Sequence, residues 1–123
     1  MSDCATGQWE EALRPIASLI SKSEKAQQRL ATGTWQHGML RDNLKALRIA
    51  SALMDRQTGV TGSFRRDDLE DAFREFAVMI SRTEKVQAKF PPGTSQHTLL
   101  RNRIKALGIA QELTKLELDK CNA

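Results

Sequence analysis

The feature that most constrains this chain is an internal duplication, in which one half of the sequence repeats the other at a shift of sixty residues. Residues 20–53 and 80–113 align without insertion or deletion, and shorter matches resume upstream of both. Two related stretches of one chain should fold alike, so the structure of the first copy is expected to recur in the second. The sequence therefore predicts a pair of similar building blocks.

Length and composition indicate one helical domain. A chain of 123 residues can bury one core but is too short for two independent ones. Leu, Ala, Lys, Arg, Gln and Glu dominate, aromatic residues make up 5% and tyrosine is absent, which favours helices over strands. We therefore expect a single all-α domain over residues 1–123, with internal repeats at 9–54 and 69–114 and a linker at 57–66.

Apolar residues recur at three- and four-residue steps, which is the spacing of amphipathic helices. Four helices are expected on this pattern, over residues 8–30, 35–56, 67–90 and 95–120, whereas the polar residues 1–7 should be frayed. Each pair of helices belongs to one copy of the duplication.

A tight turn separates the two helices of each copy, at residues 31–34 and 91–94. Proline cannot continue a helix, glycine supplies unusual backbone angles, and threonine can accept hydrogen bonds from the next helix's free amides. Two such hairpins predict an all-α, antiparallel four-helix bundle built from tandem homologous hairpins with pseudo-two-fold symmetry. A stack of two solenoid-like hairpins is the alternative, but known helical repeats are shorter and the tetratricopeptide pattern is absent.

Polar residues that both copies keep are the candidates for a site, because packing explains only the apolar ones. They are Glu24, Gln27, His37, Arg41 and Lys45 in the first copy and Glu84, Gln87, His97, Arg101 and Lys105 in the second. Folding a hairpin about its turn pairs positions whose numbers sum to about 65 in the first copy, which brings Glu24 opposite Arg41 and Gln27 opposite His37 or Gly38. The sequence thus predicts two equivalent polar clusters near one end of the bundle.

Two interpretations of these clusters remain open. In the structural one, each cluster is a hydrogen-bonded clasp, with Glu24 buried against Arg41 and the histidine satisfied by the facing glutamine or the turn backbone. In the other, His37, Arg41, Lys45 and Arg48 form a basic stripe that the second copy repeats. Such a stripe, beside free helix amides, could bind a phosphate, an acidic peptide or nucleic acid. No aromatic residue interleaves it for stacking on bases.

Catalysis and metal binding have less support. No Glu-x-x-His pair lies on a single expected helix, arginines share the histidine stripe and would repel a cation, and the cysteines are too far apart for a zinc pattern. Ser23, Glu24 and His37 are the only nucleophile, acid and base within reach of one another, and Thr83 replaces the serine in the second copy. We expect no catalytic residue, no metal and no cofactor.

The function expected is therefore a non-enzymatic protein-interaction or scaffolding module. Anion or nucleic-acid binding is the alternative, and a metal-binding or enzymatic bundle is a second one. A net charge of +4 permits an anionic partner without requiring one. No apolar run approaches the roughly 20 residues of a membrane span and no secretory signal is recognisable, so we expect no membrane association and a cytoplasmic location.

Self-association is expected through the second and fourth helices, whose apolar arc is wider than a single bundle core requires. The margin of this arc is formed by Ile49, Leu53, Ile109 and Leu113. Exposed apolar patches are usually covered by a partner, so a homodimer is expected. Cys4 and Cys121 could meet where the chain ends of an even-numbered bundle come together, but free thiols are expected in the cytoplasm.

Overall fold

The computed structural model describes the backbone of residues 2–55 and 64–121, and the side chains of residues 11–54 and 64–120. These residues form four helices and no strand, so the expected all-α class is confirmed. The helices are α1 (Ser2–Gln28), α2 (Trp35–Asp55), α3 (Arg66–Gln87) and α4 (Ser95–Cys121). Residues 57–63 of the expected linker over 57–66, and the side chains of both cysteines, lie outside the described residues, while Arg66 already belongs to α3.

Helix bounds agree with the predicted ones to within a few residues, except at the amino terminus. The helix α1 begins at Ser2, so the expectation of a frayed stretch is wrong over residues 2–7. The same helix continues through Pro15, whose ring cannot donate a backbone hydrogen bond.

The turn between α1 and α2 is closed by a threonine and a glycine. Gly33 has a φ of 97°, and Gly93 of the second turn has a φ of 93°, which is the left-handed region that glycine adopts without strain. The Thr34 hydroxyl donates to the Ala31 carbonyl at 2.9 Å and accepts from the His37 amide at 3.3 Å. Thr34 therefore caps α2.

The turn between α3 and α4 has the same hydrogen bonds. The Thr94 hydroxyl donates to the Pro91 carbonyl at 2.8 Å and accepts from the His97 amide at 3.2 Å. Each threonine thus satisfies one of the free amides at a helix start, and the same threonine hydrogen bonds occur in both turns.

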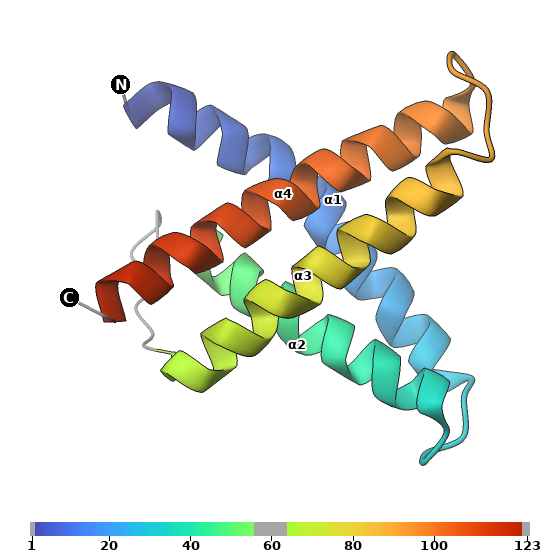
Figure 1. Cartoon of the computed structure of the whole chain (residues 1–123), viewed down its shortest axis with the longest axis horizontal. Helices are drawn as coiled ribbons and strands as arrows, with labels where there is room; N and C mark the ends of the chain where they lie inside the picture. The colour runs from blue at the N-terminus through green and yellow to red at the C-terminus, as the bar shows by residue number, and fades with distance from the viewer. Residues whose placement is uncertain (1, 56–63, 122–123) are drawn as a thin grey trace.

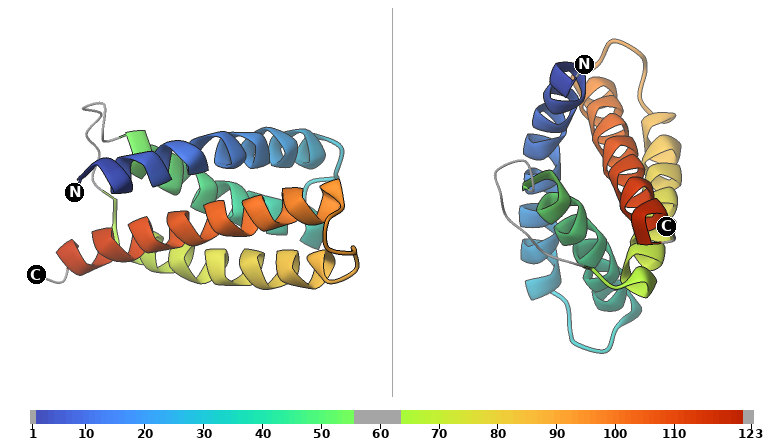
Figure 2. Two further views of the ribbon diagram at one scale, coloured as in Figure 1. Left: turned by 90° about the horizontal axis from the view of Figure 1, so that it is seen from above. Right: turned by 90° about the vertical axis from the view of Figure 1, so that its left-hand side faces the viewer.

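The helices are arranged as two hairpins that cross (Figure 1). One hairpin is formed by α1 and α2 and the other by α3 and α4, and both turns lie at the end of the molecule remote from the chain termini. The two turns occupy different corners of that end, as both views of Figure 2 show. Among the described residues, α1 and α3 do not contact each other, whereas α2 and α4 each contact all three other helices.

The core is centred on α2 and α4 because these two helices have neighbours on three sides. Leu47 and Ala50 of α2, and Leu107 and Ala110 of α4, are all at most 1% exposed. Phe76 of α3 is fully buried against them. A helix surrounded in this way needs a wide apolar arc, which is the pattern that the sequence shows for both.

The surface predicted for self-association is therefore not exposed. Ile49, Leu53 and Leu113 are 6%, 5% and 8% exposed, and Ile109 is a partly buried residue that packs against the same core. The apolar arc is wide because each central helix is covered by three helices of its own chain, so its width gives no evidence of a second chain. A homodimer, which stays a prediction, would need another surface.

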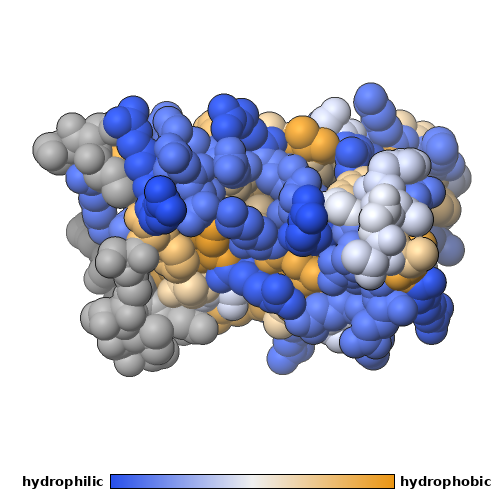
Figure 3. All heavy atoms as spheres, turned by 90° about the horizontal axis from the view of Figure 1, so that it is seen from below, coloured by the Kyte–Doolittle hydropathy of each residue, from blue (hydrophilic) through white to orange (hydrophobic). Residues whose placement is uncertain are grey.

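On the face shown in Figure 3, hydrophilic side chains predominate, and apolar atoms are visible between them in the middle of the molecule. None of the helices in the described part of the chain combines the length and apolar character needed to cross a membrane.

Candidate functional site

The predicted contact between the glutamine of one helix and the histidine of the next is confirmed, although the histidine takes part through its backbone. The Gln27 side-chain amide donates to the His37 carbonyl at 3.5 Å, and the Gln87 amide donates to the His97 carbonyl at 3.3 Å. Together with the threonine caps, these bonds tie each hairpin together at its turn. The backbone atoms of both histidines are therefore structural.

The predicted partner of Glu24 is wrong. Its carboxylate accepts a hydrogen bond of 2.7 Å from Arg48, whereas Arg41 lies 3.6 Å from its own neighbour Asp42. A helical side chain leans toward the preceding turn of its helix. In α1 this lean points away from the hairpin turn and in α2 it points toward the turn, so Glu24 meets an arginine two helical turns beyond Arg41.

The pair between Glu24 and Arg48 is also not the buried clasp expected. Their side chains are 45% and 58% exposed. An ion pair this exposed contributes at most about 1 kcal/mol to stability.

The second hairpin cannot make this ion pair, because Gly108 stands where the first hairpin has Arg48. Glu84 and Arg101 are exposed, and the structure shows no ion pair for either among the described residues. The two predicted clusters therefore share the glutamine contact and the threonine cap but not the charges.

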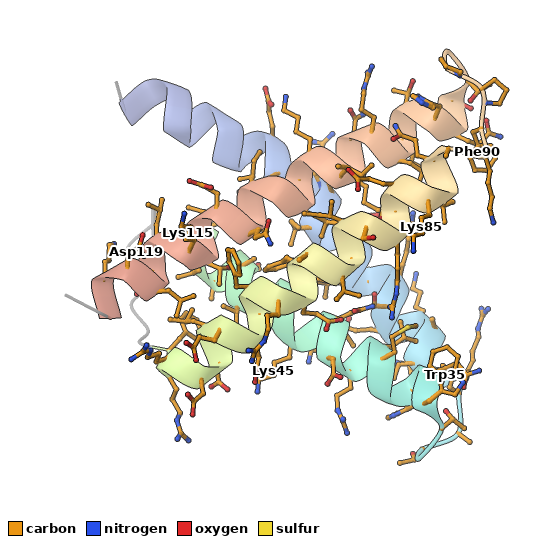
Figure 4. The ribbon with its side chains drawn as sticks, viewed as in Figure 1. Trp35, Lys45, Lys85, Phe90, Lys115 and Asp119 are labelled. Atoms are coloured by element: carbon orange, nitrogen blue, oxygen red, sulfur yellow. The ribbon has the colours of Figure 1, made fainter. Side chains whose placement is uncertain are left out.

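Lys45 and Lys105 lie away from the turns and connect the two hairpins. The Lys45 ammonium of α2 is 2.9 Å from the Asp68 carboxylate of α3, where Figure 4 shows it beside that helix. The Lys105 ammonium of α4 is 3.4 Å from the Glu11 carboxylate of α1. Asp68, through its hydrogen bond and its charge, raises the pKa of Lys45 above its ordinary value.

These contacts reduce the positive charge that the basic stripe could offer to an anion, because Arg41, Lys45 and Arg48 each have a carboxylate within 3.6 Å. The imidazoles do not converge either, because His37 and His97 follow turns at different corners of the molecule (Figure 2). Within the described residues, no three His, Cys, Asp or Glu side chains come together as metal ligands would. The Thr83 hydroxyl donates to its own helix, to the Met79 carbonyl at 2.7 Å.

Two depressions form where the hairpins cross. The acidic hollow, of about 290 Å³, lies between α2 and α3 and is lined by Asp42, Lys45, Ala46, Ile49, Asp68, Asp71, Ala72, Arg74, Glu75 and Val78. The basic groove lies between α1 and α4 and consists of two adjoining hollows of about 460 and 240 Å³. It is lined by Glu11, Ala12, Arg14, Pro15, Ser18, Lys22, Leu99, Asn102, Arg103, Lys105, Ala106 and Ile109.

The two depressions occupy corresponding positions in the duplicated sequence. Every residue that lines the larger hollow of the basic groove stands sixty positions from a residue that lines the acidic hollow. The cross-hairpin ion pairs of Lys45 and Lys105 belong to them, one to each. The shared positions therefore place the same kind of interface on two sides of the molecule.

The charges of the two depressions differ. Four carboxylates and two cations line the acidic hollow, whereas one carboxylate and four cations line the basic groove. The change comes from single positions: Asp42 and Glu75 of the hollow correspond to Asn102 and Pro15 of the groove. Burial, followed by the charge of Asp42, raises the pKa of Glu75, while Arg82 opposes this effect.

No family model, curated protein or solved structure matches this chain. The groove and the hollow are therefore interpreted from their own geometry and charge.

The residues that distinguish the basic groove were missed by the search for polar residues that both copies share. Arg14, Lys22 and Arg103 line it, and Leu99 is 53% exposed beside them. The signal that could have found them is divergence between the copies, because Arg103 corresponds to Asn43 and carries a charge that the first copy lacks.

Proposed function

We propose that this chain is a non-enzymatic protein-interaction module, folded as an antiparallel four-helix bundle of two homologous hairpins related by a pseudo-two-fold axis. The matched turns and the matched depressions between hairpins support this symmetry. A cytoplasmic location stays a prediction from the sequence.

The observation that carries the proposed function is the basic groove. Its lining combines apolar and charged side chains, and pockets of this kind receive a protein segment through side-chain contacts. Leu99 is one of the few large apolar side chains that are more than half exposed. Leu99 lines the groove beside Arg103 and Pro15, where its exposed side chain is available to contact an apolar side chain of a partner.

The duplicated polar residues are assigned a structural role in this proposal. Gln27 and Gln87 hold the turns, and Lys45 and Lys105 join the hairpins. The alternative, nucleic-acid binding on the duplicated basic stripe, is less favoured because the cations of the first copy have carboxylate neighbours within the protein.

Photo-crosslinking tests the proposed function. A benzophenone amino acid replaces Leu99 in the groove or, as the matched control, Leu116, which lies on the same helix outside the groove and is 48% exposed. Incubation with an extract of the source cells should give discrete protein adducts from position 99 that excess unlabelled protein suppresses. Equal adducts from both positions, or none from position 99, would overturn the proposal.

A further inference from the structure

The basic groove has the shape and chemistry of a receptor for one helix. The apolar part of its lining is formed by Pro15 of α1 and by Leu99, Ala106 and Ile109 of α4. Along α1 it extends from position 11 to position 22, which at the helical rise is about 16 Å, or three turns of a bound helix.

Most of the positive charge that lines the groove has no ion-pair partner among the described residues. Arg14, Lys22 and Arg103 take part in none of the ion pairs among the described residues. The exception lies at one end, where Glu11 pairs with Lys105 at 3.4 Å. Free positive charge therefore concentrates toward the Lys22 and Leu99 end.

The walls of this groove are helices whose amides and carbonyls bond internally, except for the one helical hydrogen bond that Pro15 removes, so they offer no strand edge to the partner's backbone. Strand addition is therefore excluded as the mode of recognition, and a helix that presents side chains fits the site instead. Nucleic acid fits less well, since none of the described residues that line the groove is aromatic and Glu11 would repel phosphate.

Resting on the proposed function above, we propose that the basic groove binds an acidic amphipathic helix of a partner protein. The partner's apolar side chains lie against Leu99 and Ile109, and its carboxylates face Arg14, Lys22 and Arg103. Charge complementarity identifies this occupant, since an acidic helix supplies the counter-charges that the groove lacks.

The probe is a synthetic, end-capped peptide of about three to four helical turns, with leucines at i, i+3, i+4 and i+7 and glutamates on both flanks. A scrambled peptide of the same composition controls for charge alone. Fluorescence anisotropy at physiological salt should show saturable binding of the first peptide and at least tenfold weaker binding of the scrambled one.

The duplication supplies a matched control for the receptor. Arg14→Glu with Lys22→Glu should weaken binding at least tenfold, whereas Arg74→Glu with Arg82→Glu, the corresponding change on α3, should leave it within twofold. A peptide with lysines in place of the glutamates should bind the first variant better than the unchanged protein. This rescue distinguishes lost complementarity from lost folding.

Three results would overturn this inference. They are equal binding of the scrambled peptide, tighter binding of a mixed-sequence oligonucleotide than of the peptide, and a dimer that Leu99→Asp dissociates in sedimentation, which would assign the groove to a second copy. If crosslinking from position 99 succeeds while the peptide fails, the partner's chemistry is wrong but the module survives. If both fail, the proposed function fails as well.

Discussion

The acidic hollow and the basic groove are built from corresponding positions, yet they have opposite charge. Both are formed by one central helix and one outer helix, and both include a lysine that reaches a carboxylate of the other hairpin. Their charges differ at single positions: Asp42 and Glu75 of the hollow correspond to Asn102 and Pro15, and Arg103 of the groove corresponds to Asn43.

This difference separates residues that hold the fold from residues that give each face its character. The small residues Ala46, Ala72, Ala12 and Ala106 recur in both depressions because two helices must approach closely there. Charge at the margin is not needed for that approach, so it could diverge. Function is therefore better sought where the copies differ than where they agree.

The largest effect should come from the core beneath the two depressions. Phe76 and Ile16 are corresponding residues, 0% and 1% exposed. Phe76→Ala should reduce the free energy of unfolding by about 3–5 kcal/mol and Ile16→Ala by about 2–5 kcal/mol, measured by urea unfolding. A near-silent Ile16→Ala would show that the interface under the groove is loose and that the comparison fails in the core.

A smaller effect is expected at position 15 of α1 and its counterpart in α3, where the sequences of the two outer helices differ most in their effect on helix formation. Pro15 lies inside α1, whereas Glu75 occupies the same place in α3. Pro15→Ala should raise the free energy of unfolding by up to about 3 kcal/mol, because it restores a helical hydrogen bond and removes a clash. The converse change, Glu75→Pro, should lower it by about 3 kcal/mol or more.

Thermal unfolding followed by circular dichroism measures both variants. If neither change alters the midpoint temperature of unfolding, a proline at this position does not cost stability in either helix, and the predicted difference between α1 and α3 is wrong.

The sequence was sufficient to predict the four helices, their turns and the proximity of Gln27 to His37, although not that the His37 backbone carbonyl accepts the hydrogen bond. These features depend on periodicity and on residues close in the chain, which local rules describe. It was not sufficient for the partner of Glu24, because matching residues by the height of their Cα atoms above the turn ignores the direction in which long side chains lean. Arg48 lies on the same stripe as Arg41, and its guanidinium contacts the Glu24 carboxylate.

The basic groove could not be predicted from either copy alone. Arg14 and Arg103 line one depression although they are far apart in sequence, and only the crossing of the hairpins brings α1 beside α4. The burial of Ile49 and Leu53 has the same cause. Neighbours across hairpins depend on global packing, which the hydrophobic pattern of one helix does not specify.

The smallest predicted effect sharpens the electrostatic side of the comparison. Burial and the charge of Asp42 raise the pKa of Glu75, so the folded protein holds the proton of this carboxyl more tightly than the unfolded chain does. Its contribution to stability is fully present below the unfolded pKa and is lost as the pH rises through the folded pKa.

Glu75→Gln should therefore stabilise the protein at pH 7, by less than about 1 kcal/mol, and the gain should disappear in acid. Urea unfolding at both pH values measures this gain, which should shrink in an Asp42→Asn background, where the hollow acquires the residue type found at position 102 of the groove. A gain that is independent of both pH and Asp42 would mean that packing, and not charge, distinguishes the two depressions at this position.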